Sequence, residues 1–242
     1  MRVTLISIGI GALILSDPNK CRIEITENGP YLVSGNVLLE EKIITRGENG
    51  NEYTDGSHYP QMEHYALCRC GKSKNMPFCD GHHRTTDFDG EETASGKSFL
   101  NQATIIEGPA ITLTDVEDLC AFARFCHLSS GSVWELTENS DDPELKEGAI
   151  KAACDCPAGR LVAWDNQIGQ PIEPDYQPSI VILQDPSRKC SGPIWVRGRI
   201  PIQSSDGTVY EARNRVTLCR CGQSDNKPFC DATHVSIEFD DK

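Results

Sequence analysis

The stretch CRCGKSKNMPFCDGHH occupies residues 68–83, and a near copy, CRCGQSDNKPFCDATH, occupies residues 219–234. We call these segments the first and second Cys loops. Eleven of the sixteen positions are identical, and these include all three cysteines and the final histidine. The positions that differ are mostly of surface type, so the constant feature is the spacing C-x-C-x8-C-x3-H. Cysteine and histidine at such a fixed spacing indicate a metal site.

The composition sets limits on the class of protein. The chain has 242 residues, of which 38% are apolar and 24% charged, as is ordinary for a soluble globular protein with two or three small domains. Its net charge of −13 disfavours nucleic acid and anionic membranes as partners. Twelve cysteines, clustered with histidine, favour metal ligation in a reducing compartment over disulfides. We therefore expect a cytoplasmic protein.

Residues 3–15, VTLISIGIGALIL, form the one long apolar run of the chain. The run is shorter than the roughly 20 residues that a membrane-spanning helix needs. No small-x-small cleavage site follows it, and its β-branched residues predict a buried strand rather than a targeting segment.

The repeat extends beyond the Cys loops. GPYLVSG at 29–35 matches GPIWVRG at 192–198, and HRTTDFD at 83–89 matches HVSIEFD at 234–240. Residues 46–61 are an insertion in the first copy and are expected to form a loop. Each copy predicts strands, then the Cys loop, then a short helix. Because one copy is too small for a good core, we expect the two to pack as a pseudo-twofold pair.

A different pattern lies between the copies. Residues 103–113, ATIIEGPAITL, alternate as strands do. A capping box at Thr114–Glu117 predicts a helix over residues 114–126, and Asp142 before Pro143 predicts a second helix that runs to Cys154. The predicted fold is therefore α+β and β-rich. Its expected units are 1–95, an α+β insertion at 96–165, and 166–242.

The spacing within each Cys loop suggests how the ligands are shared. Alternate residues of an extended strand face the same side, so Cys68 and Cys70 can bind one metal atom. Cys79 and His83 are four residues apart, so a helical turn would let them bind a second. The second loop repeats this arrangement with Cys219, Cys221, Cys230 and His234. The residues alone leave two interpretations: a structural zinc ion, or an iron–sulfur cluster with two irons.

The pattern C-x-C-x2-S-x3-P-x-C-D-G-x-H resembles the CDGSH iron–sulfur domain of the mitoNEET-like family. The first loop fits it throughout but has His82 where the family name has Ser, and the second has Ala232 in place of Gly. The resemblance implies a [2Fe-2S] cluster in each loop, held by three Cys and one His, and a role in electron or cluster transfer. It also implies that two units pair as a β-rich dimer, here fused into one chain.

The cysteines of the insertion show a second resemblance. Their pattern, C-x5-C followed by C-x-C-P, is similar to that of divergent monocluster ferredoxins. This implies a third iron–sulfur cluster on Cys120, Cys126 and Cys156, with Cys154 as a further candidate. Judged from the residues alone, Cys120 lies on an apolar stripe and is equally an ordinary core residue. Cys21 and Cys190 match neither pattern and are expected to be structural thiols.

The expected function is electron transfer, cluster transfer or redox sensing by a monomer whose partner is a redox or cluster-acceptor protein. We expect no enzymatic turnover, since neither loop has a Ser-His-Asp set or a carboxylate pair beside it. Two alternatives remain. One is a zinc-stabilised interaction module. The other is an electron-relay subunit of an oxidoreductase, although no G-x-G-x-x-G motif opens a βα unit in this chain.

Overall fold

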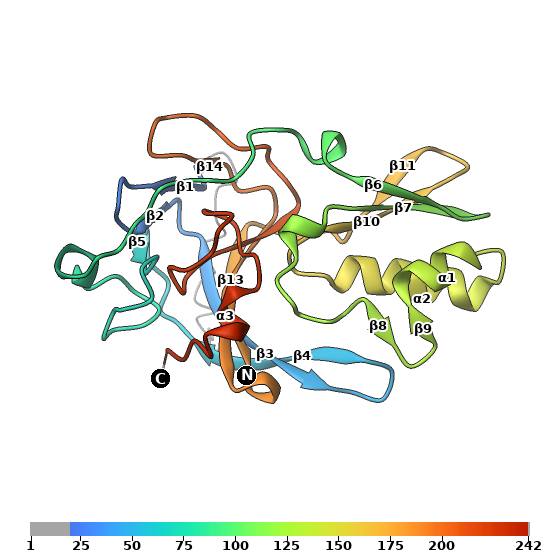
Figure 1. The fold of residues 1–242 in the computed structure, drawn as a ribbon, viewed down its shortest axis with the longest axis horizontal. Coiled ribbons are helices and arrows are strands. Elements are labelled where there is room, and N and C mark those ends of the chain that lie inside the picture. Colours follow the sequence, from blue (N-terminus) through green and yellow to red (C-terminus); the bar gives the residue numbers. More distant parts are fainter. Residues whose placement is uncertain (1–19, 242) are drawn as a thin grey trace, which may run out of the picture.

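The two repeated segments lie side by side, and the segment between them projects from one side of the pair (Figure 1). The computed structural model describes residues 20–241, so the strand predicted at residues 3–15 lies outside the described residues. The strands and helices of the two repeats are β1 (Arg22–Ile25), β2 (Tyr31–Ser34), β3 (Leu38–Arg46), β4 (Asn51–His58), β5 (His64–Leu67), β12 (Ser179–Asp185), β13 (Cys190–Arg197), β14 (Ile202–Gln203), β15 (Arg215–Leu218) and α3 (Thr233–Ser236). Those of the insertion are β6 (Thr104–Glu107), β7 (Ile111–Asp115), β8 (His127–Leu128), β9 (Gly131–Ser132), α1 (Val133–Glu138), α2 (Pro143–Asp155), β10 (Leu161–Asp165) and β11 (Gln170–Ile172).

The two repeats form two sheets of related topology. One sheet has the strand order β14-β1-β2-β5, and the other has the order β15-β13-β12-β3-β4. In each sheet, the strand before the Cys loop pairs antiparallel with the strand that follows the Gly-Pro turn: β5 with β2, and β15 with β13. The register is the same in both, with Tyr31 opposite Leu67 and Ile194 opposite Leu218. Segments 29–35 and 192–198 therefore contribute equivalent strands, as the pseudo-twofold prediction requires.

Each repeat also contributes to the sheet of the other: the first gives β3 and β4, and the second gives β14. After β2, the chain crosses over and β3 pairs in parallel with β12 of the second repeat. After β13, it crosses back and β14 pairs in parallel with β1 of the first repeat. Neither sheet is complete without a strand from the other copy.

A single core joins the two sheets. Buried Ile, Val, Leu and Tyr side chains from both repeats pack into one apolar cluster, among them Ile23, Tyr31, Ile182 and Leu218. Tyr31 is fully buried, and its hydroxyl donates a hydrogen bond to the carbonyl of Cys219 at 2.7 Å. This hydrogen bond to the backbone of the second Cys loop satisfies the buried hydroxyl. The core thus connects the first repeat to the Cys loop of the second.

The loop expected at residues 46–61 is mostly a strand. β4 occupies Asn51–His58 and forms a hairpin with β3. This hairpin extends beneath the insertion (Figure 1), where the amide of Ser129 donates to the carbonyl of Asn49 at 3.2 Å. A loop was expected because the segment is rich in Gly, Asn and Asp, which are depleted in strands. The hydrogen-bonded ladder with β3 nevertheless holds the segment extended.

The insertion is a four-stranded sheet with the order β11-β10-β7-β6, covered by α1 and α2. α2 confirms the predicted helix, because Asp142 caps it through the amides of Glu144 and Leu145, and Ala149 and Ala153 are fully buried. The sheet includes β11, which lies beyond the expected boundary at residue 165. Helix α1 was not predicted, although Ser132 and Glu135 form a capping box at its start.

The helix predicted over residues 114–126 is wrong. Thr114 and Asp115 belong to β7, where they pair with Val162 and Leu161 of β10. Only a 3₁₀ turn at Glu117–Leu119 follows, and Phe122 and Arg124 then have φ angles of 55° and 63°. Two left-handed residues of this kind cannot occur inside an α-helix. The first residues of the expected capping box therefore pair in a strand instead of starting a helix.

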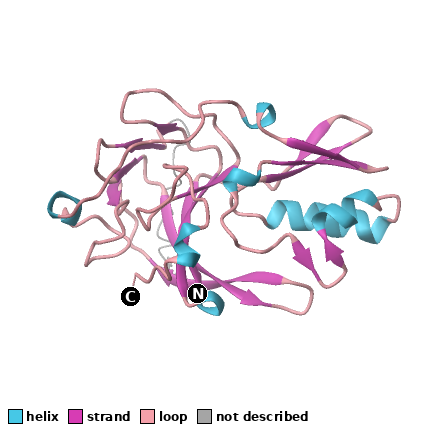
Figure 2. Ribbon diagram, in the orientation of Figure 1, coloured by secondary structure: helices cyan, strands magenta, loops and turns pink. Residues whose placement is uncertain are grey.

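Strands and loops make up most of the two repeats, and the longer helices lie in the insertion (Figure 2). Among residues 20–241, no helix has the length and apolar character needed to cross a membrane.

Candidate metal centres

The first Cys loop begins where β5 ends and brings two thiols together. Cys68 and Cys70 are buried, and their sulfurs are 3.7 Å apart. The loop can close so tightly because Gly71 adopts a φ of 71°, which costs glycine little. The hydrogen bond from Cys70, and then the amides of Ser73, Gly71 and Lys72, lower the pKa of Cys68 to about 6 against the opposing effect of burial. The pair is therefore ready to lose a proton, as a thiolate ligand must.

The second pair of donors lies across a tight turn. The sulfur of Cys79 is 3.4 Å from Nδ1 of His83. The two residues meet as predicted, but not on one helix: Gly81 is left-handed with a φ of 86°, and a 3₁₀ turn begins only at His82. Nδ1 is therefore the nitrogen of His83 that faces the sulfur.

Polar residues of the motif hold the loop in shape. The hydroxyl of Ser73 donates to the carbonyl of Phe78 at 2.6 Å and accepts from the amide of Asn75 at 3.0 Å. The carboxylate of Asp80 accepts from the amides of Lys74 and His82, at 2.8 and 3.0 Å. These bonds fix both ends of the loop around the donor atoms, so the donors are positioned by backbone contacts.

The second Cys loop repeats this geometry closely. The sulfurs of Cys219 and Cys221 are 3.6 Å apart, and the sulfur of Cys230 is 3.4 Å from Nδ1 of His234. The peptide bond before the proline is cis in both loops. The hydrogen bond from Cys221, and then backbone amides, lower the pKa of Cys219 to about 7, while burial opposes this.

Ala232 takes the place of the glycine in the second loop without changing its path. Its φ is 72°, close to the 86° of Gly81. The left-handed conformation expected at this position is therefore retained, at a cost of roughly 1 kcal/mol for a residue with a Cβ.

The arginine inside each C-R-C sequence is a structural residue that the motif analysis missed. Arg69 is 1% exposed and donates to the carbonyls of Thr26 and Gly90. Arg220 is also 1% exposed; it donates to the carbonyl of Gly192 at 2.7 Å and forms an ion pair with Asp241. The sequence did hold a signal for this role. In an extended C-R-C segment the arginine side chain must point away from the side that carries the two sulfurs.

The two Cys loops are packed against each other at their glycines. A Cβ atom placed on Gly71 would lie 2.5 Å from the carbonyl oxygen of Cys221, and one placed on Gly222 would lie 2.6 Å from that of Cys70. Such approaches are closer than van der Waals contact allows. Glycine at both positions therefore lets the backbones of the two candidate sites touch.

The donors of the two loops differ in burial. Cys79 and His83 are half-buried, whereas Cys230 and His234 are only 3% and 4% exposed. The insertion accounts for part of this cover, because Cys230 packs in the same apolar cluster as Cys156. Burial, and secondarily Arg220, lower the pKa of His234 to about 4.

Three of the four cysteines of the insertion lie together. Cys120 and Cys156 both interact electrostatically with Cys126, whose pKa burial and these neighbours raise to about 11. Cys154 is directed elsewhere, and its thiol donates to the carbonyl of Ile172 at 3.4 Å. Cys120 also lies within electrostatic range of Cys230 of the second Cys loop.

Cations flank this group of three thiols. Arg160 forms an ion pair with Asp115 at 2.6 Å and interacts electrostatically with Cys120. Arg215 is 1% exposed and donates to the carbonyl of Cys156 at 2.8 Å. Nearby positive charge would suit this group if its sulfurs were ionised.

The remaining two cysteines lie in the protein core. Cys21 is 3% exposed, and its thiol donates to the carbonyl of Gly35 at 3.5 Å. Cys190 is 6% exposed at the start of β13. None of the twelve cysteines forms a disulfide.

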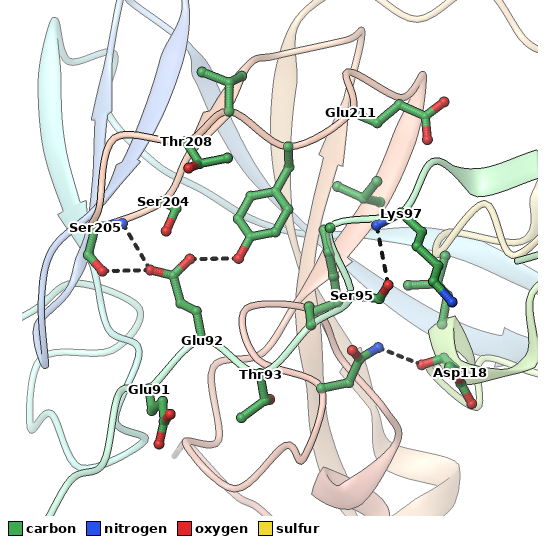
Figure 3. Close-up of a pocket in the computed structure, with 18 of the residues that line it drawn as sticks. Glu91, Glu92, Thr93, Ser95, Lys97, Asp118, Ser204, Ser205, Thr208 and Glu211 are labelled. Carbon is green, nitrogen blue, oxygen red and sulfur yellow. Dashed lines mark hydrogen bonds between the residues drawn. The ribbon is translucent and has the colours of Figure 1, made fainter. Parts of the chain in front are cut away.

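One cavity adjoins the second Cys loop and the insertion, and Leu119, Asn226 and Phe229 are among the residues that line it. It has a volume of about 750 Å³ and lies between the segment 89–102, the hairpin 204–211 and the edge of the insertion. Glu92 bridges one wall, accepting from Ser205 at 2.9 Å and from the hydroxyl of Tyr210 at 2.8 Å (Figure 3). Asn226 of the second Cys loop donates to the carbonyl of Asp118 at 2.9 Å, joining the loop to the insertion.

The donor distances fit metal binding in pairs. A tetrahedral metal with bonds of about 2.3 Å to sulfur and about 2.0 Å to nitrogen separates two sulfurs by about 3.7 Å and a sulfur and a nitrogen by about 3.5 Å. Each Cys–Cys and Cys–His pair is close to these separations. Among residues 20–241, no three Cys, His, Asp or Glu side chains converge as ligands of a single ion would.

Comparison with known families agrees with this arrangement. Residues 28–84 and 191–235 match the family described as iron-binding zinc finger, CDGSH type, and residues 106–166 match the family described as divergent 4Fe-4S mono-cluster. Comparisons with curated proteins and with solved structures gave no significant match. The chain is therefore a tandem CDGSH iron–sulfur protein with an inserted divergent ferredoxin-like module.

Proposed function

We propose that the protein holds one [2Fe-2S] cluster in each Cys loop and transfers electrons or whole clusters without turning over a substrate. The first cluster would be held by Cys68, Cys70, Cys79 and His83, and the second by Cys219, Cys221, Cys230 and His234. The observation that supports this most is the division of each donor set into a Cys–Cys pair and a Cys–His pair. Each pair has the separation expected for one iron.

This arrangement favours two metal atoms in each loop over one zinc ion. A structural zinc site places four donors around one ion. A [2Fe-2S] cluster instead takes two donors on each iron, and mixed Cys and His ligation of such clusters occurs in proteins. When bound, the cluster supplies a site that accepts and releases one electron, and the chain supplies thiolates and a neutral imidazole.

The test is the metal content of protein purified without oxygen. We expect a coloured protein with about four iron and about four acid-labile sulfide per chain if only the Cys loops are loaded. A colourless protein with about two zinc and no sulfide would overturn the proposal and leave a zinc-stabilised interaction module.

A third cluster is a further part of this proposal. The grouping of Cys120, Cys126 and Cys156 supports it, and the hydrogen bond of Cys154 to Ile172 removes Cys154 from the ligand set. The iron content should then rise to about seven or eight. The variant Cys126→Ser should lose that additional iron, whereas Cys154→Ser should keep it. Equal iron content in both variants would contradict the assignment.

The proposal includes a monomeric state, a cytoplasmic location and a redox or cluster-acceptor protein as partner. The strand exchange supports the monomer, because the pairing surface of each repeat is already used within the chain. Light scattering of the loaded protein should give the mass of one chain. The alternative, an electron-relay subunit of an oxidoreductase, would be recognised by co-purification with a flavin- or nicotinamide-binding chain.

A further inference from the structure

The rim of the first Cys loop carries exposed positive charge. Lys72, Lys74 and Arg84 are exposed, and His82 is half-buried beside them. They lie within a few residues of the candidate ligands, and Arg84 interacts electrostatically with Cys79. The loop therefore presents cations next to its most accessible donors, in a chain whose net charge is −13.

The second Cys loop lacks this rim. Gln223, Asp225, Thr233 and Val235 occupy the equivalent positions. The backbone and the donor geometry of the two loops are the same, so neither metal binding nor folding of the loop requires the cations. The charge is a property of the first loop alone.

The cations of the rim are available to a partner. Among the ion pairs of residues 20–241, none includes Lys72, Lys74 or Arg84. Asp80, the carboxylate of the same loop, accepts from two backbone amides, which lower its pKa. Unpaired surface cations of this kind interact with approaching charges at long range.

The second loop is also less accessible. Cys230 and His234 are almost fully buried, and the insertion and the segment at residues 93–94 contact the loop, with the amide of Thr93 donating to the carbonyl of Lys227 at 2.8 Å. A protein that approaches the molecule can therefore come near a candidate cluster most easily at the first loop.

We propose that the rim of Lys72, Lys74 and Arg84 is the docking surface for an acidic electron-transfer protein. The inference rests on the proposed function, since it concerns the same first site. The chain as a whole, with a net charge of −13, repels such a partner, so attraction at the rim would also orient it. In the transfer, one electron leaves the reduced cofactor of the partner and enters the oxidised cluster, and no bond or proton changes.

The test uses the loaded full chain and a small acidic flavodoxin as the probe. Stopped-flow absorbance follows reduction of the protein by reduced flavodoxin, and surface plasmon resonance measures binding of oxidised flavodoxin, each at low and high salt. The variant Lys72→Gln/Lys74→Asp gives the first loop the residues of the second. We expect the second-order rate constant and the affinity to fall by about tenfold or more at low salt, with a smaller difference at high salt.

Two controls separate docking from other effects. Lys97→Asp/Lys146→Gln makes the same change in net charge away from the loop, and the rate constant should stay within about twofold of the unmodified protein. Reduction by photoreduced deazariboflavin, which is uncharged, should be the same in all variants. The iron content and the reduction potential should also be unchanged.

The outcomes distinguish the docking surface from the proposed function. Equal rates and affinities in the loop variant and the remote variant would overturn the docking surface while leaving the clusters in place. Binding to vesicles of anionic lipid but not to flavodoxin would overturn it too. A chain without iron, which no reductant reduces, would instead refute the proposed function.

Discussion

In the first Cys loop the candidate ligands Cys79 and His83 are half-buried, whereas in the second loop Cys230 and His234 are 3% and 4% exposed. The local geometry is nevertheless the same, down to the hydrogen bonds of the Ser and Asp of the motif. The sequence of the loop therefore determines how donors are arranged, and the surroundings determine how accessible they are. The insertion covers one loop and leaves the other open, so two equal sites can differ in role.

The largest expected effect concerns the arginines of the two loops. Arg220 has the buried carboxylate of Asp241 as its partner, whereas Arg69 has only carbonyls. The variant Asp241→Asn leaves a buried charge unpaired, so the free energy of unfolding should fall by about 3–5 kcal/mol. Chemical denaturation measures this. Glu238→Gln, an exposed change three residues away, should alter it by less than about 0.5 kcal/mol, and equal effects would contradict the role of the pair.

The same pair predicts a pH dependence. Burial raises the pKa of Asp241, but the charge of Arg220 and the hydrogen bonds together lower it by more, so the net shift is downward. A carboxyl whose pKa is lower in the folded state contributes full stability above its unfolded pKa of about 3.9 and loses it as the pH falls below that value. The stability of Asp241→Asn should lack this step.

The contact between the loops gives the next largest effect. Gly71→Ala places a Cβ against the carbonyl of Cys221 at a residue with positive φ. We expect a loss of roughly 2–3 kcal/mol in unfolding free energy, from strain and overpacking together. Because the contact is shared, Gly222→Ala should cost a similar amount. A loss confined to one of the two variants would show that the loops do not press on each other.

A change at the candidate ligand His83 should give the two clusters different reduction potentials. His83→Cys replaces a neutral imidazole by a thiolate and should lower the reduction potential of the first cluster by on the order of 100 mV. The second cluster should keep its potential, so a titration followed by absorbance should show two steps. His82→Ala is the control, because His82 is not among the paired donors. A single unshifted step in His83→Cys would mean that His83 does not bind iron.

The difference in burial predicts unequal iron loss. With an iron chelator in excess, iron should leave the first loop roughly tenfold faster than the second, because the exposed region opens at lower free energy. The variants Cys79→Ser and Cys230→Ser, each with one loop disabled, assign the two phases. One phase with a common rate would contradict the idea that the insertion protects the second site.

The smallest effect tests the one backbone substitution between the loops. Nothing lies within 4 Å of a Cβ placed on Gly81, and Ala232 already occupies the equivalent position. Gly81→Ala should therefore cost only about 1 kcal/mol, for the left-handed conformation. Ala232→Gly should raise the free energy of unfolding by a similar amount. A loss as large as that of Gly71→Ala would show that the two positions are not equivalent.

The parts of the structure that could be predicted from sequence are those set by short-range patterns. The donor pairs in each loop follow from the spacing, and helix α2 follows from Asp142 and Pro143. Helix α1 had its signal in Ser132 and Glu135, which was overlooked. The clustering of Cys120 with Cys126 was obscured by the wrong helix, since left-handed Phe122 and Arg124 bend the chain.

Long-range pairing could not be predicted in this way. Residues 51–58 are poor strand formers that become β4 only because β3 provides a ladder. The pairing of β3 with β12, and of β1 with β14, joins residues distant in the chain and leaves no local signature. The inward direction of Arg69 and Arg220 likewise depends on carbonyls supplied by other segments.

The strand exchange has a consequence for the order of events on the ribosome. The sheet of the first repeat contains β14, so it cannot close until residues 202–203 have emerged. The first Cys loop likewise rests on Gly222 and Cys221, which are made later still. A chain that grows from its N-terminus must therefore carry its first set of thiols unassembled through most of synthesis. Iron can be enclosed in the finished geometry only when both repeats are present.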